Sequence, residues 1–221
     1  MRNRFDMQLQ CLDEQLTHMG ELCEVAIANA TKALQEGNVG QAKAVMEADE
    51  EIDQMEKDIE RLCLKLLLQQ QPVARDLRRI SAALKMITDV ERIGDQTSDI
   101  AEIVISSERV AKSDIEEIGR MAGAVSRMVR DSVTAYVSKD LELAKNVILA
   151  DDAVDTYFED VKEQMIHYIK EEKGHHGKQI FDLIMVTKYL ERIGDHATNI
   201  AEWVEFSITG VHRNNAELEL K

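Results

Sequence analysis

Apolar residues recur at intervals of three and four along most of the chain, which is the spacing that places them on one face of an α-helix. Breakers interrupt this pattern at a few points. Gly37, Gly174 and Gly210 suit the left-handed position that follows a helix, and Pro72 cannot continue one. The pattern predicts six long helices, over residues of about 4–36, 38–70, 73–108, 113–138, 140–172 and 178–209.

The second half of the chain repeats the first. ERIGDQTSDIAE at 91–102 matches ERIGDHATNIAE at 191–202 with eight of twelve positions identical, and the helix over 38–70 aligns with that over 140–172 at an offset of 102. Asn38 and Asp140 are equivalent predicted N-caps of these two helices. Because the loops are short, neighbouring helices are expected to pack antiparallel. We therefore expect an all-α protein of two tandem three-helix bundles, residues 1–110 and 111–210, followed by a polar tail over 211–221.

Composition and charge agree with this and narrow the possible partners. Ten glycines and one proline in 221 residues leave few places to turn, which disfavours sandwiches and propellers. The 42 acidic residues outnumber the 27 basic ones, and a net charge of −15 disfavours binding to nucleic acid or to anionic membrane surfaces. No apolar stretch is long enough to insert into a membrane, the start has no secretory signal, and the three cysteines form no CxxC pair. These features predict a cytoplasmic protein.

The helix over 73–108 carries a stripe of acidic residues that spans about 80° of its circumference. No lysine or arginine lies within the stripe, although like charges one turn apart repel each other. The same positions of the last helix form a second stripe, which Lys188 flanks. The first stripe consists of Glu91, Asp95, Asp99 and Glu102, and the second of Glu191, Asp195, Asn199 and Glu202.

Two interpretations of the stripes remain open. They can be solvated surfaces, or their carboxylates can bind a cation that cancels the repulsion. Oxygen ligands alone suit hard ions such as magnesium, calcium, manganese or iron, and the duplication favours a metal site. Gly94 and Gly194 lie at equivalent places in the two stripes, where a small residue lets another helix approach closely. Weaker candidate ligands are Glu102, Glu202 and the pairs Asp49 with Asp53 and Asp151 with Asp155, whose helices are acidic on nearly all sides.

Other kinds of site are poorly represented in the sequence. No Ser or Cys nucleophile has a recognisable partner, no glycine-rich loop follows a strand, and Cys and His do not cluster at zinc spacing. The sequence therefore predicts no catalytic residues. Arg75, Arg78 and Arg79 form a small basic cluster that is either a solvated helix end or a docking contact for an acidic partner.

Three segments together resemble the PhoU family of bacterial phosphate-signalling regulators. They are MRNRFDMQLQCL at the start, QQQPVARDLRRI at 69–80 and the duplicated ERIGD segments. The resemblance implies two homologous three-helix bundles, a homodimer, and one multinuclear metal site per bundle. Its metal-binding motifs correspond to Glu91 with Asp95 and to Glu191 with Asp195, and Asp99 and Asn199 occupy the next turn. With one fewer carboxylate, the second site is expected to bind its metal more weakly or to prefer another ion.

The same resemblance implies a function. It is that of a negative regulator of the phosphate-starvation response and of phosphate uptake, an adaptor between the ATPase of the phosphate ABC transporter and a phosphate sensor histidine kinase. No enzymatic activity is implied. The metal would be divalent or trivalent, with iron, manganese, magnesium and zinc as candidates. The alternatives are a metal-dependent hydrolase or metal-storage bundle that uses the same carboxylates, and a structural helical protein whose acids are merely solvated.

Overall fold

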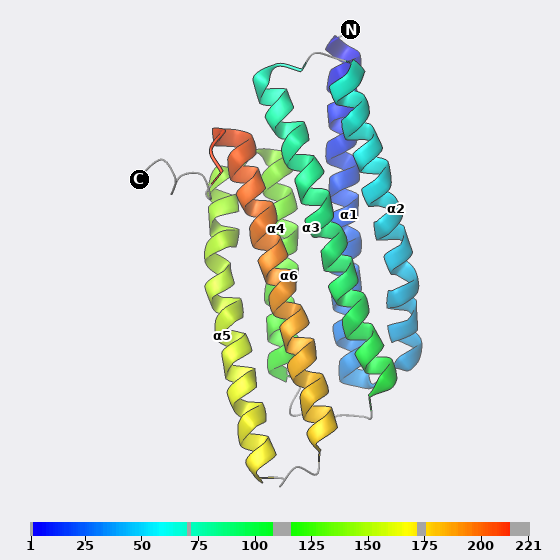
Figure 1. Cartoon of the computed structure of the whole chain (residues 1–221), viewed down its shortest axis with the longest axis vertical. Coiled ribbons are helices and arrows are strands. Elements are labelled where there is room, and N and C mark those ends of the chain that lie inside the picture. Colours follow the sequence, from blue (N-terminus) through cyan, green and yellow to red (C-terminus); the bar gives the residue numbers. More distant parts are fainter. Residues whose placement is uncertain (1, 70–71, 108–115, 172–175, 213–221) are drawn as a thin grey trace.

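Six long helices make up the computed structural model, which describes residues 2–69, 72–107, 116–171 and 176–212 (Figure 1). No strand occurs within these ranges, so the predicted all-α fold is confirmed. The predicted junction at 110–111 and most of the predicted tail over 211–221 lie outside the described residues. The helices are α1 (Arg2–Glu36), α2 (Val39–Gln69), α3 (Ala74–Ser106), α4 (Glu116–Ser138), α5 (Leu141–Glu171) and α6 (Gly177–Thr209).

The ends of several helices follow from the predicted capping residues. Asn38 Oδ1 accepts a 3.0 Å hydrogen bond from the backbone N–H of Gln41, and Asp140 Oδ1 accepts one of the same length from Leu143. Gly37 precedes Asn38 with a φ of 62°, in the left-handed region that glycine adopts without strain. Both predicted N-caps are therefore confirmed.

The two halves pack side by side through their inner helices (Figure 1). α3 and α6 run in opposite directions along the middle of the molecule, α1 and α4 also contact each other, and α2 and α5 lie at the two outer edges. Apolar side chains from all six helices form one continuous core. Burial of this apolar surface supplies most of the stability of such a bundle, and it leaves the polar faces of α2 and α5 available for chemistry.

A few polar contacts fix how the halves lie against each other. Asp89 Oδ1 on α3 lies 2.9 Å from His196 Nδ1 on α6 and accepts a 3.2 Å hydrogen bond from Asn199 Nδ2. Asp89 lies near the middle of this interface; at its end, beside the C-terminus of α3, Ser107 Oγ donates a hydrogen bond to Asp182 Oδ2. None of the described helices is both long enough and apolar enough to cross a membrane.

Candidate metal centre

The first acidic cluster lies between α2 and α3. Asp53 on α2 and Glu91 and Asp95 on α3 each place a carboxylate oxygen within 4.8 Å of the oxygens of the other two. Asp53 and Glu91 are half-buried, whereas Asp95 is exposed, so the cluster is open to solvent on one side. The packing of α2 against α3 thus brings the predicted pair Glu91 and Asp95 together with a residue that sequence analysis ranked lower.

Asp49, one turn before Asp53, extends the cluster through a close contact with Gly94. A Cβ atom on residue 94 would lie only 2.6 Å from Asp49 Oδ1 and 3.2 Å from a methyl group of Ile52. The predicted close approach of another helix at this glycine is confirmed. The Oδ1 atom of Asp49 is itself buried and has no hydrogen-bond partner among the described residues, while the Ser98 side chain interacts with the same carboxyl group and partly offsets the rise in its pKa. An unpaired buried carboxylate oxygen is costly, and a bound cation would satisfy it.

The electrostatics of the first cluster also point to a missing positive charge. Burial, followed by the charge of Asp95, raises the pKa of Asp49 to about 6 and that of Glu91 to about 7. Arg92 only partly offsets the rise at Glu91. The cluster thus offers four carboxylates, those of Asp49, Asp53, Glu91 and Asp95. Among the described residues, none of them forms an ion pair with a lysine or arginine, and such a set of oxygen donors fits a hard metal ion.

The second cluster consists of the corresponding carboxylates between α5 and α6, which lie less close together. Among the described residues, only Asp53, Glu91 and Asp95 of the first half form a group of three with carboxylate oxygens within 4.8 Å of one another. Asp151 and Asp155 take the places of Asp49 and Asp53, and a Cβ atom on Gly194 would lie 3.3 Å from Asp151 Oδ1. Burial, followed by the charge of Asp195, raises the pKa of Asp151 to about 6. Here, however, the protein supplies its own cation, since Lys188 Nζ lies 2.5 Å from Glu191 Oε2.

The remaining members of the two stripes lie elsewhere. Asn199 points across the interface between the halves and donates its hydrogen bond to Asp89. Asp99, which is half-buried, lies outside the three-carboxylate cluster but next to it. Burial and then the charges of Asp95 and Glu102 raise the pKa of Asp99, and Arg192 of α6 partly offsets this rise. Glu102 is exposed and Glu202 half-buried, and neither belongs to the cluster of three.

Glu56 lies beside the first cluster and was missed by sequence analysis. Its Oε1 atom accepts a 3.4 Å hydrogen bond from Thr88 Oγ1, and its charge contributes to the raised pKa of Glu91. It lies three residues after Asp53, on the same face of α2. The three-residue spacing from Asp53 was the sequence feature that could have identified Glu56 as a neighbour of the cluster.

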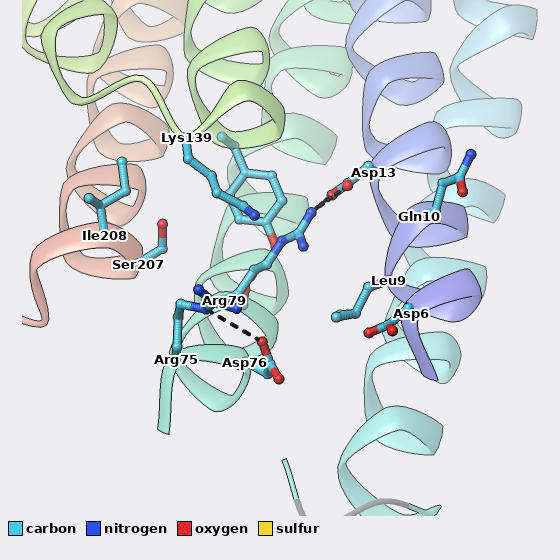
Figure 2. A pocket seen from close by; sticks show the side chains of 11 residues that line it. Asp6, Leu9, Gln10, Asp13, Arg75, Asp76, Arg79, Lys139, Ser207 and Ile208 are labelled. Carbon is cyan, nitrogen blue, oxygen red and sulfur yellow. Dashed lines mark hydrogen bonds and ion pairs between the residues drawn. The ribbon is translucent and has the colours of Figure 1, made fainter. Parts of the chain in front are cut away.

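Arg75, Arg78 and Arg79, the basic cluster at the start of α3, lie in three different environments; Figure 2 shows Arg75 and Arg79. Arg79 is only 14% exposed and forms an ion pair with Asp13 of α1 in the same half. It contacts the second half through Tyr136, whose ring centroid lies 5.7 Å away and whose hydroxyl donates a 2.9 Å hydrogen bond to the Arg79 backbone oxygen. Arg78 packs against Gly210. Arg75 remains exposed at the edge of a cavity of about 330 Å³, into which Lys139 of the second half also points. Of the three arginines, Arg75 is the one that a partner can reach.

Comparison with known proteins agrees with this architecture. The PhoU domain matches the chain twice, over residues 16–104 and 118–204. A phosphate-specific transport system accessory protein PhoU homolog from Clostridium acetobutylicum is 36% identical over 211 residues, which cover 95% of this chain and 96% of that protein. The homolog from Aquifex aeolicus is 38% identical over 187 residues, 84% of each chain.

Solved structures match equally well. The crystal structure of PhoU from Pseudomonas aeruginosa has a TM-score of 0.87 and 33% identity, and the match covers 94% of this chain and all of that one. A phosphate transport system regulatory protein PhoU from Streptococcus pneumoniae shares the fold, with a TM-score of 0.87 over 94% of this chain and 98% of its own. The duplicated domain, the full-length relatives and the shared fold together show that the chain belongs to the PhoU family.

Proposed function

We propose that the chain is an accessory regulator of phosphate transport that works by binding other proteins, not by catalysis. Support comes from its family, whose relatives over nearly the whole length are named phosphate-specific transport accessory proteins. The proposed adaptor is cytoplasmic and homodimeric, and it links the ATPase of a phosphate ABC transporter to a sensor histidine kinase. In that position it keeps both phosphate uptake and the phosphate-starvation response low.

Metal ions held by carboxylates are the second part of the proposal. The observation that carries it is the cluster of Asp53, Glu91 and Asp95, with the unpaired Oδ1 atom of Asp49 beside it. Donors that are all oxygen fit magnesium, manganese or iron better than zinc, which prefers nitrogen and sulfur ligands. A bound ion supplies the positive charge that the cluster lacks. The carboxylates of α2 and α3 would hold it, which ties the outer helix to the inner one and orders the surface offered to partners.

A docking contact is proposed at Arg75. Its side chain is 74% exposed, and its interaction with Asp76 is loose, with Nε and Oδ1 3.9 Å apart. Because the chain is acidic as a whole, the exposed Arg75 and the nearby Lys139 offer a local contact for an acidic segment of a partner, although Asp6 and Asp76 line the same cavity.

The experiment compares partner binding with metal content. The transporter ATPase and the cytoplasmic part of the kinase are titrated against the wild type, against E91A/D95A and against R75E. E47A/E51A is the matched control, because it also removes two acids one turn apart, on an exposed part of α2. We expect E91A/D95A to lose metal and partner affinity together, R75E to lose affinity but keep metal, and the control to keep both.

Two results would argue against this function. Full partner binding by metal-free E91A/D95A would remove the metals from the regulatory role. Turnover of a phosphoester that disappears in E91A/D95A would favour the metal-dependent hydrolase instead.

A further inference from the structure

The two acidic clusters differ at a pair of positions that contact each other. Glu56 of α2 corresponds to Phe158 of α5, and Thr88 of α3 corresponds to Lys188 of α6. In the first half Thr88 donates a hydrogen bond to Glu56. In the second half Lys188 Nζ lies 5.3 Å from the centroid of the Phe158 ring. A carboxylate and a hydroxyl are thus exchanged for an aromatic ring and an ammonium group.

This exchange changes the charge of the cluster. The carboxylates of Asp53, Glu91 and Asp95, with those of Asp49 and Glu56 beside them, form no ion pair with a lysine or arginine in the described part of the chain. In the second half, the carboxylates of Asp151, Asp155, Glu191 and Asp195 interact electrostatically without three of them coming within 4.8 Å of one another, and the Lys188 ammonium lies among them. The Lys188 side chain is 39% exposed, and it contacts Glu191, which is only 15% exposed. The ammonium therefore lies at the inner, better-shielded carboxylate, where its charge is screened least.

We propose that the Lys188 ammonium group, held against the Phe158 ring, replaces part of the positive charge that metal ions supply in the first half. The second half therefore binds metal more weakly and holds fewer ions than the first. The inference rests on the proposed metal binding by the carboxylates. A metal ion at Glu191 meets the repulsion of the ammonium group, and moving Lys188 aside gives up its contact with the Phe158 ring. Because the lysine is covalently attached, its ammonium group loses no translational entropy at this site, whereas a free ion does.

The inference also changes the expected cause of the asymmetry. From the sequence, the missing carboxylate at Asn199 accounted for a weaker second site. The Asn199 amide instead contacts Asp89 across the interface between the halves. The difference in charge between the clusters thus lies at Lys188 and Phe158, while Asp155 is also more exposed than Asp53.

The test uses full-length chains in which one cluster has been removed. E191A/D195A keeps the first cluster and E91A/D95A keeps the second, and each is titrated with Mn²⁺ by calorimetry. We expect the first cluster to bind Mn²⁺ about tenfold more tightly or better, since a unit charge at this distance in a partly screened site is worth at least that factor. Installing the first-half residues in the second cluster, as F158E/K188T, should recover about tenfold in affinity, and E56F/T88K in the first cluster should lose a similar factor.

Two further variants separate the charge of Lys188 from other effects. K188R keeps the charge and should keep the weak binding, whereas K188M removes the charge from a partly exposed position with little risk to folding. K162T is the matched control, because Lys162 also lies over the Phe158 ring, at 5.5 Å, but pairs with Glu159. It should leave Mn²⁺ affinity unchanged.

The outcomes separate this inference from the proposed function. Equal affinities of the two wild-type clusters, or unchanged affinity in both F158E/K188T and K188M, would overturn the role of Lys188 and leave the metal sites standing. Absence of Mn²⁺ binding by both single-cluster proteins would overturn the metal sites and this inference together.

Discussion

Asp49 Oδ1 lies directly over Gly94, where a Cβ atom would come within 2.6 Å of it. The glycine of the first ERIGD segment therefore sets how closely α2 approaches α3 at the acidic cluster. Because the nearest atom is the end of a side chain, an added methyl group displaces the Asp49 carboxylate more easily than it displaces the helix. The contact has a greater bearing on the cluster than on the stability of the bundle.

G94A should consequently lower metal affinity by about tenfold, as a change next to a ligand typically does. The helical preference of alanine, about 1 kcal/mol over glycine, offsets much of the steric cost in the free energy of unfolding. G194A is the matched control, since the nearest atoms to its Cβ lie at 3.2 and 3.3 Å. Calorimetric titration and urea unfolding of both variants check this. Equal metal affinities of G94A and the wild type would contradict it.

The metal-free chain should lose stability as the pH rises from about 4 to about 7, between the ordinary and the raised pKa values of the Asp49 and Glu91 carboxyl groups. Burial and neighbouring carboxylates raise the pKa of Glu91 from 4.5 to about 7 and that of Asp49 to about 6. A carboxyl group whose pKa is higher in the folded state favours folding when protonated. That contribution is complete below the ordinary pKa and is lost as the pH rises through the raised one.

Urea unfolding of the chelator-treated protein across this pH range measures the effect. E91Q, which cannot ionise, should show a shallower fall than the wild type, and the exposed-site variant E47Q should follow the wild type. Parallel curves for E91Q and wild type would show that Glu91 does not titrate in this range.

Asp13 and Arg79 should form the main ion pair between α1 and α3 of the first half, beside Tyr136 of the second half. Arg79 is 14% exposed and Asp13 19%, so D13A leaves a largely buried guanidinium group without its carboxylate. We expect D13A to lower the free energy of unfolding by about 3 kcal/mol. E116A, which breaks the exposed pair between Arg120 and Glu116, should change it by less than about 1 kcal/mol. Similar losses from the two substitutions would refute the structural role assigned to Arg79.

Asn199 should act at the interface between the halves and not in the second cluster. N199D places a carboxylate beside that of Asp89, to which the Asn199 amide now donates a hydrogen bond. We expect N199D to be less stable than the wild type by about 1–2 kcal/mol and to bind no additional metal. N199A, which removes only the hydrogen bond, is the milder control. A gain of metal in N199D would place this side chain in the cluster after all.

The fold was predictable from residues whose effects are local. Asn38 and Gly37 act within a turn of the chain, so helix boundaries follow from the sequence, and the duplicated ERIGD segments indicate the two-fold plan. The site was only partly predictable. A stripe about 80° wide on one helix can face two neighbours in a bundle, and here Glu91 faces α2 while Asp99 interacts with α6.

The ranking of Asp49 and Asp53 shows the same difficulty. Their helix carries acids on nearly all sides, and which of them face α3 depends on how the helices pack. The repetition of this pair as Asp151 and Asp155 was the sequence feature that favoured Asp49 and Asp53 over the other acids of their helix. The contact between Lys188 and Phe158 joins residues thirty positions apart on different helices, and only the tertiary structure brings them together.

Elemental analysis of the untagged protein, purified without chelator, tests the central claim most directly. The wild type should carry a hard metal ion, most of that metal should disappear in E91A/D95A, less should disappear in E191A/D195A, and E47A/E51A should match the wild type. A folded wild type that carries no metal and whose melting temperature does not change with added Mn²⁺, Mg²⁺ or Fe²⁺ would contradict the account, and the acidic clusters would then be solvated surface.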